Sequence, residues 1–292
     1  MFTGKLVVDQ ILNGLVLGCM YASMASGLTL IWGTMKMLNF AHGEFYMVGG
    51  YVLYFATTAF GISPLLGLAL AVGIVFALGM LLEKGIIEPL LNKPGWELSP
   101  IVATVGASIA IQNGALKFFG ERFKNLPYFV EGTLDIFGVR MAYQRVIIFS
   151  VTAVVMVGFW LFIKKARFGL GLRAVAQDRD AATLMGISFK RVYTINFGLS
   201  CGLAALAAAL LAPIFSINPW MGLAALTKGF VAVVLGGLGS FGGAILSGMI
   251  LGCAESIAVI VLSSEWKDVV AFAIFILVLT VKPSGLFGTK DW

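Results

Sequence analysis

Long apolar segments follow one another along almost the whole chain, and this succession restricts the fold more than any other feature. A helix that crosses a membrane needs about 20 mostly apolar residues. Seven stretches are clear candidates: 7–32, 64–82, 98–118, 145–163, 192–212, 244–262 and 268–282. Two further stretches, 44–60 and 223–238, are shorter or run into glycines. The sequence therefore predicts an all-α integral membrane protein, a polytopic bundle of eight or nine transmembrane helices. Nine are expected if 44–60 crosses fully, and eight if it is re-entrant.

The composition agrees with a lipid-embedded chain. Of the 292 residues, 60% are hydrophobic and 12% are charged, whereas a typical soluble domain has about 25% charged residues. The cysteines Cys19, Cys201 and Cys253 lie in apolar segments, without a CxxC pattern or a neighbouring histidine. We interpret them as small buried hydrophobic residues and expect no disulfide, metal site or cofactor. No linker divides the chain, so we expect one transmembrane domain over residues 1–292.

Positive charge is concentrated in one loop, residues 164–191. This loop holds seven basic and two acidic residues, a net charge of +5, while the whole chain carries +6. Basic loops stay on the cytoplasmic side of a membrane, and strict alternation of the spans then places the C-terminus there too. Within the loop, 178–186 is a short amphipathic stretch that Gly186 would end as a helix C-cap. The loop is either a signal for orientation alone or also a docking surface for a soluble partner.

A polar break interrupts the apolar pattern at Asn39-Phe40-Ala41-His42-Gly43-Glu44, which holds the only histidine of the chain. Ionisable groups at membrane depth are costly and commonly line a pathway or pair with one another. The segment therefore borders a translocation path, with Asn39 or His42 tying neighbouring helices together. Alternatively it is a turn in which Asn39 caps a helix and Glu44 stabilises its first turn. A catalytic His–Glu pair is disfavoured, because no nucleophile or second base accompanies it.

A glycine-rich segment, Gly236-Gly237-Leu238-Gly239-Ser240-Phe241-Gly242-Gly243, follows one of the shorter apolar stretches. Five glycines in eight residues do not favour a continuous helix. The segment is either a broken helix whose backbone amides face a pore or a tight turn between two packed helices. It does not match a phosphate-binding loop, because the chain contains no GxxxxGK[ST] pattern.

Three motifs, in this order, resemble one known family. LNFAHGEFYMVGGY (38–51), GLGLRAVAQDRDAATLMGI (169–187) and AVVLGGLGSFGGAILSGMILG (232–252) are similar to segments of the branched-chain amino-acid ABC-importer permeases, and so is EWKDVVAFAIFILVLTVKPSGLFG near the end. The chain most resembles the shorter of the two permease subunits in such importers. The similarity extends over essentially the full length, and three spaced motifs are more specific than shared composition.

The resemblance implies a single transmembrane permease domain, 1–292, with a cytoplasmic coupling loop at 164–191. Residues that match the family's coupling loop are Arg173, Ala174, Asp178, Ala182, Gly186 and Ile187. Residues that match its polar motif, and are candidates for the translocation path, are Asn39, His42, Gly43 and Glu44. Residues that match its glycine motif, also path candidates, are Gly236, Gly237, Gly239, Ser240 and Gly243.

The resemblance also implies partners and a location. The partners are a second homologous permease, two cytoplasmic ATP-binding subunits and a periplasmic or surface-tethered substrate-binding protein, in the lipid bilayer of a bacterial inner membrane and without nucleic acid. ATP would be hydrolysed on the separate subunits, so the chain itself is not expected to be an enzyme. The substrates would be branched-chain amino acids, or other amino acids, urea, amides or aromatic compounds.

A stand-alone secondary transporter or channel for small polar solutes is the alternative. Such a protein needs ionisable residues inside its spans to couple transport to an ion gradient. The predicted spans offer few of them, chiefly Glu255 and, near one end, Lys117. This scarcity favours an external source of energy, as in an ATP-driven importer.

Overall fold

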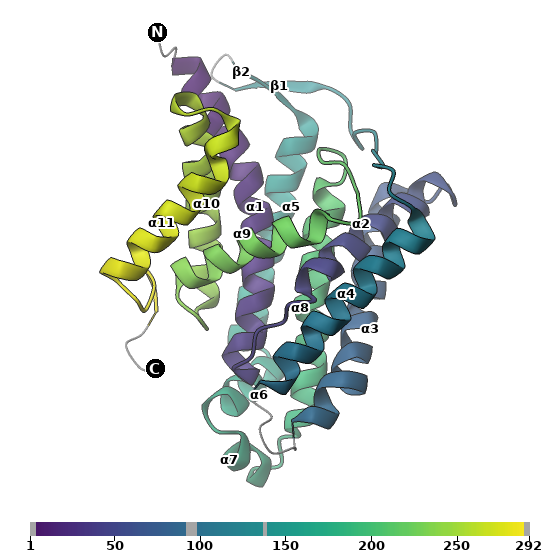
Figure 1. Cartoon of the computed structure of the whole chain (residues 1–292), viewed down its shortest axis with the longest axis vertical. Coiled ribbons are helices and arrows are strands. Elements are labelled where there is room, and N and C mark those ends of the chain that lie inside the picture. The colour runs from purple at the N-terminus through teal and green to yellow at the C-terminus, as the bar shows by residue number, and fades with distance from the viewer. Residues whose placement is uncertain (1–3, 92–97, 137–138, 289–292) are drawn as a thin grey trace.

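The structure is a computed structural model that describes residues 4–91, 98–136 and 139–288. Apart from one short hairpin, these residues form helices and their connections (Figure 1). Each of the nine predicted apolar stretches coincides with a helix. These are α1 (Gly4–Met35), α2 (His42–Thr58), α3 (Pro64–Leu82), α4 (Ser99–Phe119), α5 (Tyr143–Lys165), α8 (Phe189–Leu211), α9 (Met221–Gly236), α10 (Phe241–Val261) and α11 (Lys267–Val281).

Six of these helices are long and apolar enough to cross a membrane: α1, α3 with its continuation to Leu90, α4, α5, α8 and α10. The continuation of α3 is a π-helical turn, Glu83–Ile87, followed by a 3₁₀ turn, Glu88–Leu90. The other three, α2, α9 and α11, have only 17, 16 and 15 residues. The structure thus agrees with a polytopic helical bundle and leaves the number of complete crossings, predicted as eight or nine, as a prediction.

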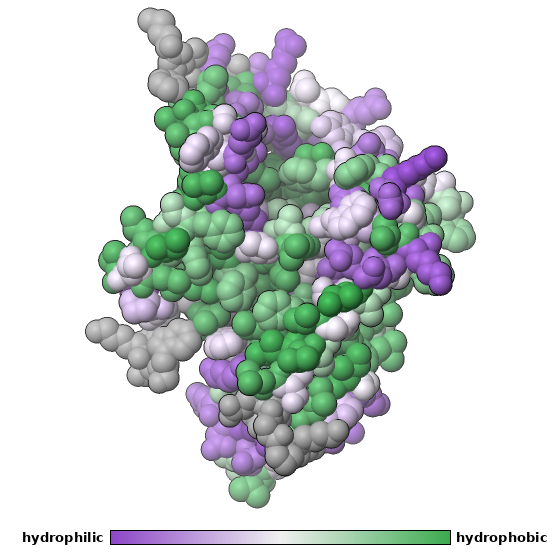
Figure 2. All heavy atoms as spheres, viewed as in Figure 1, coloured by the Kyte–Doolittle hydropathy of each residue, from purple (hydrophilic) through white to green (hydrophobic). Residues whose placement is uncertain are grey.

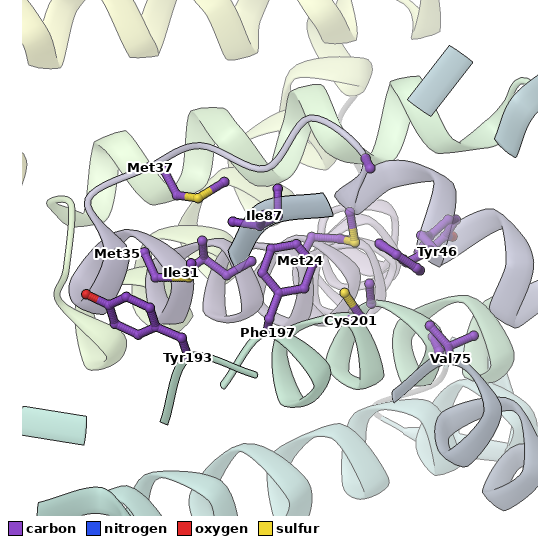
Figure 3. Packing of buried hydrophobic residues seen from close by; sticks show 14 of the residues in the cluster. Met24, Ile31, Met35, Met37, Tyr46, Val75, Ile87, Tyr193, Phe197 and Cys201 are labelled. Atoms are coloured by element: carbon purple, nitrogen blue, oxygen red, sulfur yellow. The ribbon is translucent and has the colours of Figure 1, made fainter. Parts of the chain in front are cut away.

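Helices α1 and α8 form the centre of the bundle. In each, 83% of the most apolar window is buried by the rest of the chain, against 22% in α3, 11% in α4 and 17% in α5. Figure 3 shows Met24 and Ile31 of α1 beside Phe197 and Cys201 of α8, with Val75 of α3 in the same cluster. The outer helices keep apolar side chains exposed on their outer surface, as expected where lipid is the solvent.

Small residues allow the central helices to approach closely, as is usual in membrane bundles. Gly14 and Gly18 of α1 face α10, where a Cβ on Gly14 would lie 2.6 Å from Cys253 Cα. Gly79 of α3 faces α8, where a Cβ on Gly79 would lie 2.8 Å from Cys201 Cβ. The α1–α10 contact is therefore made almost backbone to backbone, and at the α3–α8 contact Gly79 leaves room for the side chain of Cys201.

The two ends of the molecule differ in structure. At the end where α1 begins, strands β1 (Thr133–Ile136) and β2 (Val139–Ala142) pair antiparallel, with Thr133 opposite Ala142. At the opposite end, the basic loop forms two helices, α6 (Arg167–Gln177) and α7 (Arg179–Leu184), which project from the bundle (Figure 1). The loop predicted as one short helix thus holds two.

Replacing Gly14 by valine tests the close contact between α1 and α10. Overpacking of this kind typically costs about 1–3 kcal/mol, and the atom in the way is backbone, which cannot rotate aside. We expect a lower midpoint of thermal unfolding for Gly14→Val in detergent, followed by the loss of monodisperse protein on size exclusion. Gly73→Val is the control, because a Cβ on Gly73 meets nothing within 4 Å; equal midpoints for the two variants would contradict this description of the interface.

Candidate functional site: a crossing helix between two cavities

The polar break predicted at residues 39–44 is buried inside the bundle. After α1 ends at Met35, the chain runs without helical structure to His42, where α2 begins. Asn39, His42 and Glu44 are each at most 3% exposed. Asn39 Oδ1 accepts a hydrogen bond from Ala41 N at 3.0 Å. Asn39 therefore stabilises the turn before α2 and is not the N-cap, which is Ala41 and has no side-chain bond to the helix.

His42 joins three helices. Its Nδ1 lies 3.4 Å from Ser200 Oγ of α8, and Ser200 Oγ donates to the carbonyl of Gly27 in α1 at 2.7 Å. A Cβ on Gly27 would lie 2.6 Å from His42 Cε1, so the ring rests directly on the backbone of α1. The arrangement agrees with the predicted role of His42 in tying neighbouring helices together.

Glu44 lies where two helices begin. Its Oε1 accepts from Ser108 Oγ of α4 at 3.1 Å, and it occupies the first turn of α2 as predicted. Gly43, beside it, meets Gly222 in the first turn of α9, where a Cβ on Gly222 would lie 2.7 Å from Gly43 C. Three buried atoms of the break, Asn39 Nδ2, His42 Nε2 and Glu44 Oε2, have no hydrogen-bond partner among the described residues.

Helix α9 crosses the front of the bundle (Figure 1). Its residues line two cavities. The outer cavity, on the side of β1 and β2, has a volume of about 350 Å³. Its lining residues are Leu17, Met20, Tyr21, Tyr46, Phe215, Ser216, Asn218, Met221, Ala224, Ala225 and Lys228. The inner cavity, of about 290 Å³, lies further along α1 and includes Leu28, Asn39, Phe40, Thr227 and Phe230. Figure 2 shows the surface hollowed above α9, where the outer cavity opens.

The two cavities are lined by opposite faces of α9. Met221, Ala225 and Lys228 face the outer one, whereas Leu223, Thr227 and Phe230 face the inner one. Side chains two positions apart on a helix point in directions that differ by about 200° around its axis. Each residue of α9 that faces the outer cavity is therefore followed, two positions later, by one that faces the inner cavity. Helix α9 is thus a partition one helix thick.

A buried ion-pair network attaches α9 to its neighbours. Lys228 Nζ lies 2.6 Å from Glu255 Oε1 of α10 and 2.7 Å from Asp268 Oδ1 of α11. The hydroxyl of Tyr21 in α1 donates to Glu255 Oε2 at 2.6 Å. The side chains of Lys228 and Glu255 are 11% and 1% exposed, while that of Asp268 is 75% exposed. Of the two buried residues, Glu255 was predicted as an ionisable residue of a span and Lys228 was not; the signal for Lys228 was its position within the short apolar stretch 223–238.

The glycine segment is a turn between α9 and α10. Gly237 and Gly239 have positive φ angles of 94° and 89°, and Ser240 caps α10 by accepting from Gly243 N at 3.2 Å. The C-terminal segment packs on this turn, with Leu286 N donating to Leu235 O at 2.7 Å. These contacts agree with the tight-turn interpretation, and the path role of Gly236, Gly237, Gly239, Ser240 and Gly243 stays a prediction.

The basic loop folds as the predicted capped helix, preceded by a second one. Asp178 Oδ1 accepts from Asp180 N and Ala181 N, both at 2.9 Å, and so caps α7. Gly186 ends α7 with a φ of 85°, and its N–H donates to Thr183 O. Sequence analysis missed α6, although its spacing of Phe168, Leu172 and Val175 on one face was the signal.

Four of the six residues predicted for partner docking contact the rest of the bundle. Ala174, Ala182 and Ile187 pack inward against the core of the bundle, and Arg173 donates to the carbonyls of Ile163 and Lys164 at the end of α5. The side chains that do project are Leu184 and Met185, 90% and 82% exposed. Figure 2 shows an apolar tip at this end of the molecule, next to polar residues.

Comparison with known proteins defines the class. Residues 10–279 match the family model described as the permease component of branched-chain amino acid transport systems. The chain therefore belongs to this family, and it is a multi-pass membrane protein.

Particular relatives are similar over nearly the full length. The high-affinity branched-chain amino acid transport system permease protein BraD of Pseudomonas aeruginosa is 38% identical over 97% of this chain and 96% of its own. The permease protein LivH of Escherichia coli K12 is 37% identical over the same shares. A chain of PsaBC from Streptococcus pneumoniae, solved in complex with a Fab, has the same fold with a TM-score of 0.51 and 14% identity, covering 93% of this chain and 91% of that one.

Removing one partner of the buried ion pair tests its structural role. Lys228→Met leaves Glu255 as an unpaired buried charge, which typically costs about 3–5 kcal/mol. We expect a marked fall in the thermal unfolding midpoint, largely restored in Lys228→Met/Glu255→Gln, where no buried charge is left unpaired. Lys117→Met on the exposed surface of α4 is the matched control. A single variant as stable as the control would show that the pair contributes little.

Proposed function

We propose that this chain is one permease subunit of an ATP-driven importer for branched-chain amino acids, in the inner membrane of a bacterial cell. It forms the translocation path with a second, homologous permease. Two ATP-binding subunits hydrolyse ATP on the cytoplasmic side, and a substrate-binding protein delivers the amino acid from outside. Support comes from the family and from the names of its relatives BraD and LivH.

The projecting helix α7 carries this proposal. Leu184 and Met185 are large apolar side chains with almost complete exposure, and they lie at the tip of the most basic loop of the chain. Exposed apolar groups rimmed by polar ones are typical of protein–protein contacts. We therefore propose that the loop 164–191 is cytoplasmic and docks on an ATP-binding subunit, with Arg173, Asp178 and Gly186 maintaining its shape. The C-terminus then lies on the same side.

The translocation path follows the two cavities. The outer cavity faces the side of β1 and β2, the inner one includes Asn39, and α9 lies between them. We propose one membrane domain in which all nine apolar helices enter the bilayer, α2 and α9 as short helices that meet at Gly43 and Gly222. ATP binding on the partners moves α7 and rocks this permease against the second one, so that the path opens to each side in turn. No covalent chemistry takes place on the permease.

A secondary transporter remains a second candidate because of one observation. Lys228, Glu255, Asp268 and Tyr21 form the kind of intramembrane ionisable network that proton-coupled carriers use. The docking helix and the family favour the importer.

One experiment separates the importer from the secondary transporter. The tagged chain is purified from its native membranes in mild detergent, the co-purifying chains are identified, and the protein is reconstituted into liposomes. Leucine uptake that needs internal ATP supports the importer, whereas uptake by the chain alone, driven by a proton gradient, contradicts it.

Placing a charge at the tip of α7 tests the docking role. Leu184→Asp should leave the permease in the membrane, because the side chain makes no buried contact, and should abolish both co-purification of the ATP-binding subunits and ATP-driven uptake. Leu184→Met keeps the apolar tip and is expected to behave as wild type. Normal uptake by Leu184→Asp would refute docking at this surface.

His42 variants separate a path role from a structural one. His42→Gln can still hydrogen-bond Ser200, so we expect normal assembly and most of the wild-type uptake. His42→Leu cannot make this bond and should lower the thermal unfolding midpoint. If His42→Gln assembles normally but no longer transports, the imidazole itself acts in the path and the helix-tying role is insufficient.

A further inference from the structure

The outer cavity combines an apolar lining with one cation. Its apolar residues are Leu17, Met20, Phe215, Met221, Ala224 and Ala225, and Lys228 is the charged residue among those that line it. The volume of about 350 Å³ falls in the range of about 300–1,000 Å³ that small-molecule sites occupy. The described lining of the inner cavity, by contrast, contains no charged residue. The two sides of α9 therefore offer different chemistry to a solute.

Lys228 retains a donor that none of its contacts with the described residues uses. An ammonium group has three N–H donors, and the described contacts of Lys228 employ two of them, one on Glu255 and one on Asp268. Of these two contacts, the one with Asp268 is easier to replace, because the Asp268 side chain is 75% exposed and water can solvate it. A carboxylate that enters the cavity can therefore reach Lys228 without leaving a buried charge unpaired.

Oxygen atoms that can receive an ammonium group also border the cavity. The hydroxyl of Tyr46 donates to the thioether of Met20 at 3.3 Å, a weak acceptor, and the oxygen itself can accept further bonds. Ser216 and Asn218 belong to the same lining. The cavity thus presents a cation, neutral oxygen acceptors and an apolar surface, which are the three features that a zwitterionic amino acid with an apolar side chain requires.

We propose that the outer cavity is a transient binding site for an apolar α-amino acid, with the substrate carboxylate held by Lys228. This inference rests on the proposed importer function and adds to it a residue that recognises the α-carboxylate. The apolar side chain lies against α1 and the first turns of α9. Movement of α9 then transfers the amino acid to the inner cavity, where no charged lining residue retains it.

Photolabelling of the working importer tests this site. The complete complex is reconstituted with its binding protein, supplied with a diazirine analogue of leucine and ATP, irradiated, and digested for mass spectrometry. We expect labels on Leu17, Met20, Met221 or Ala224. In Lys228→Met/Glu255→Gln, designed to keep the fold, labelling should fall by about tenfold or more, the effect of losing a charge-assisted hydrogen bond. Lys228→Arg, which keeps the charge and the pair with Glu255, should retain it.

Several outcomes would overturn the inference. Labels confined to residues outside the outer cavity would do so, and so would undiminished labelling of the double variant. ATPase activity stimulated by the loaded binding protein is recorded for each variant, because a merely unfolded permease loses this stimulation as well. If wild type shows no ATP-driven uptake, the proposed function itself fails. A parallel irradiation with the free analogue at millimolar concentration, without the binding protein, then shows whether the cavity still binds an apolar amino acid.

Discussion

The salt bridge between Lys228 and Glu255 determines where α9 lies, and much of the candidate path depends on it. Two charges in a lipid-surrounded bundle are costly unless they pair closely and satisfy their remaining hydrogen-bonding groups. Here the ammonium is shared by two carboxylates, and the second oxygen of Glu255 accepts from Tyr21. One network thereby connects α1, α9, α10 and α11. Because the pair cannot separate without exposing a buried charge, α9 and α10 are expected to move together, whereas the contact with the exposed Asp268 is easier to exchange.

A set of contacts leads from the proposed docking helix, α7, to the central helices of the bundle. Helix α8 begins a few residues after α7, and its first turns are attached to the continuation of α3 by two bonds: Lys190 pairs with Glu88 at 2.8 Å, and Thr194 donates to Glu83 at 2.6 Å. Further along, Ser200 contacts both Gly27 of α1 and His42 of α2. These contacts connect α8, which follows α7 along the chain, with α1, α2 and the continuation of α3. Spatial continuity does not itself measure coupling, which is why the uptake of the Leu184 variants matters.

The helices could be predicted from the sequence because lipid imposes a simple rule. Every apolar stretch of sufficient length had to be helical, since backbone groups in hydrocarbon have no water to bond, and all nine stretches are. Contacts between helices follow no such local rule. Ala182 looked available for docking because α7 is amphipathic, but the side of α7 that carries Ala182 faces the core cluster, and Leu184 and Met185 are left outside. Lys228 escaped notice because a single lysine in an apolar stretch gives no sign of partners that lie 27 and 40 residues further along the chain.

Glu44 shows how a buried carboxylate can serve the architecture as well as a path. The first turns of α2 and α9 meet at Gly43 and Gly222, and a Cβ on Gly222 would lie 3.1 Å from Glu44 Oε2. Each helix start carries about half a positive charge from its unpaired N–H groups. One carboxylate at the meeting point of two such ends is favourably placed in spite of its burial. A polar residue at membrane depth need not face a solute, and its neighbours decide its role. By this criterion Glu44 stabilises the junction at which α2 and α9 begin, while Lys228 faces the outer cavity.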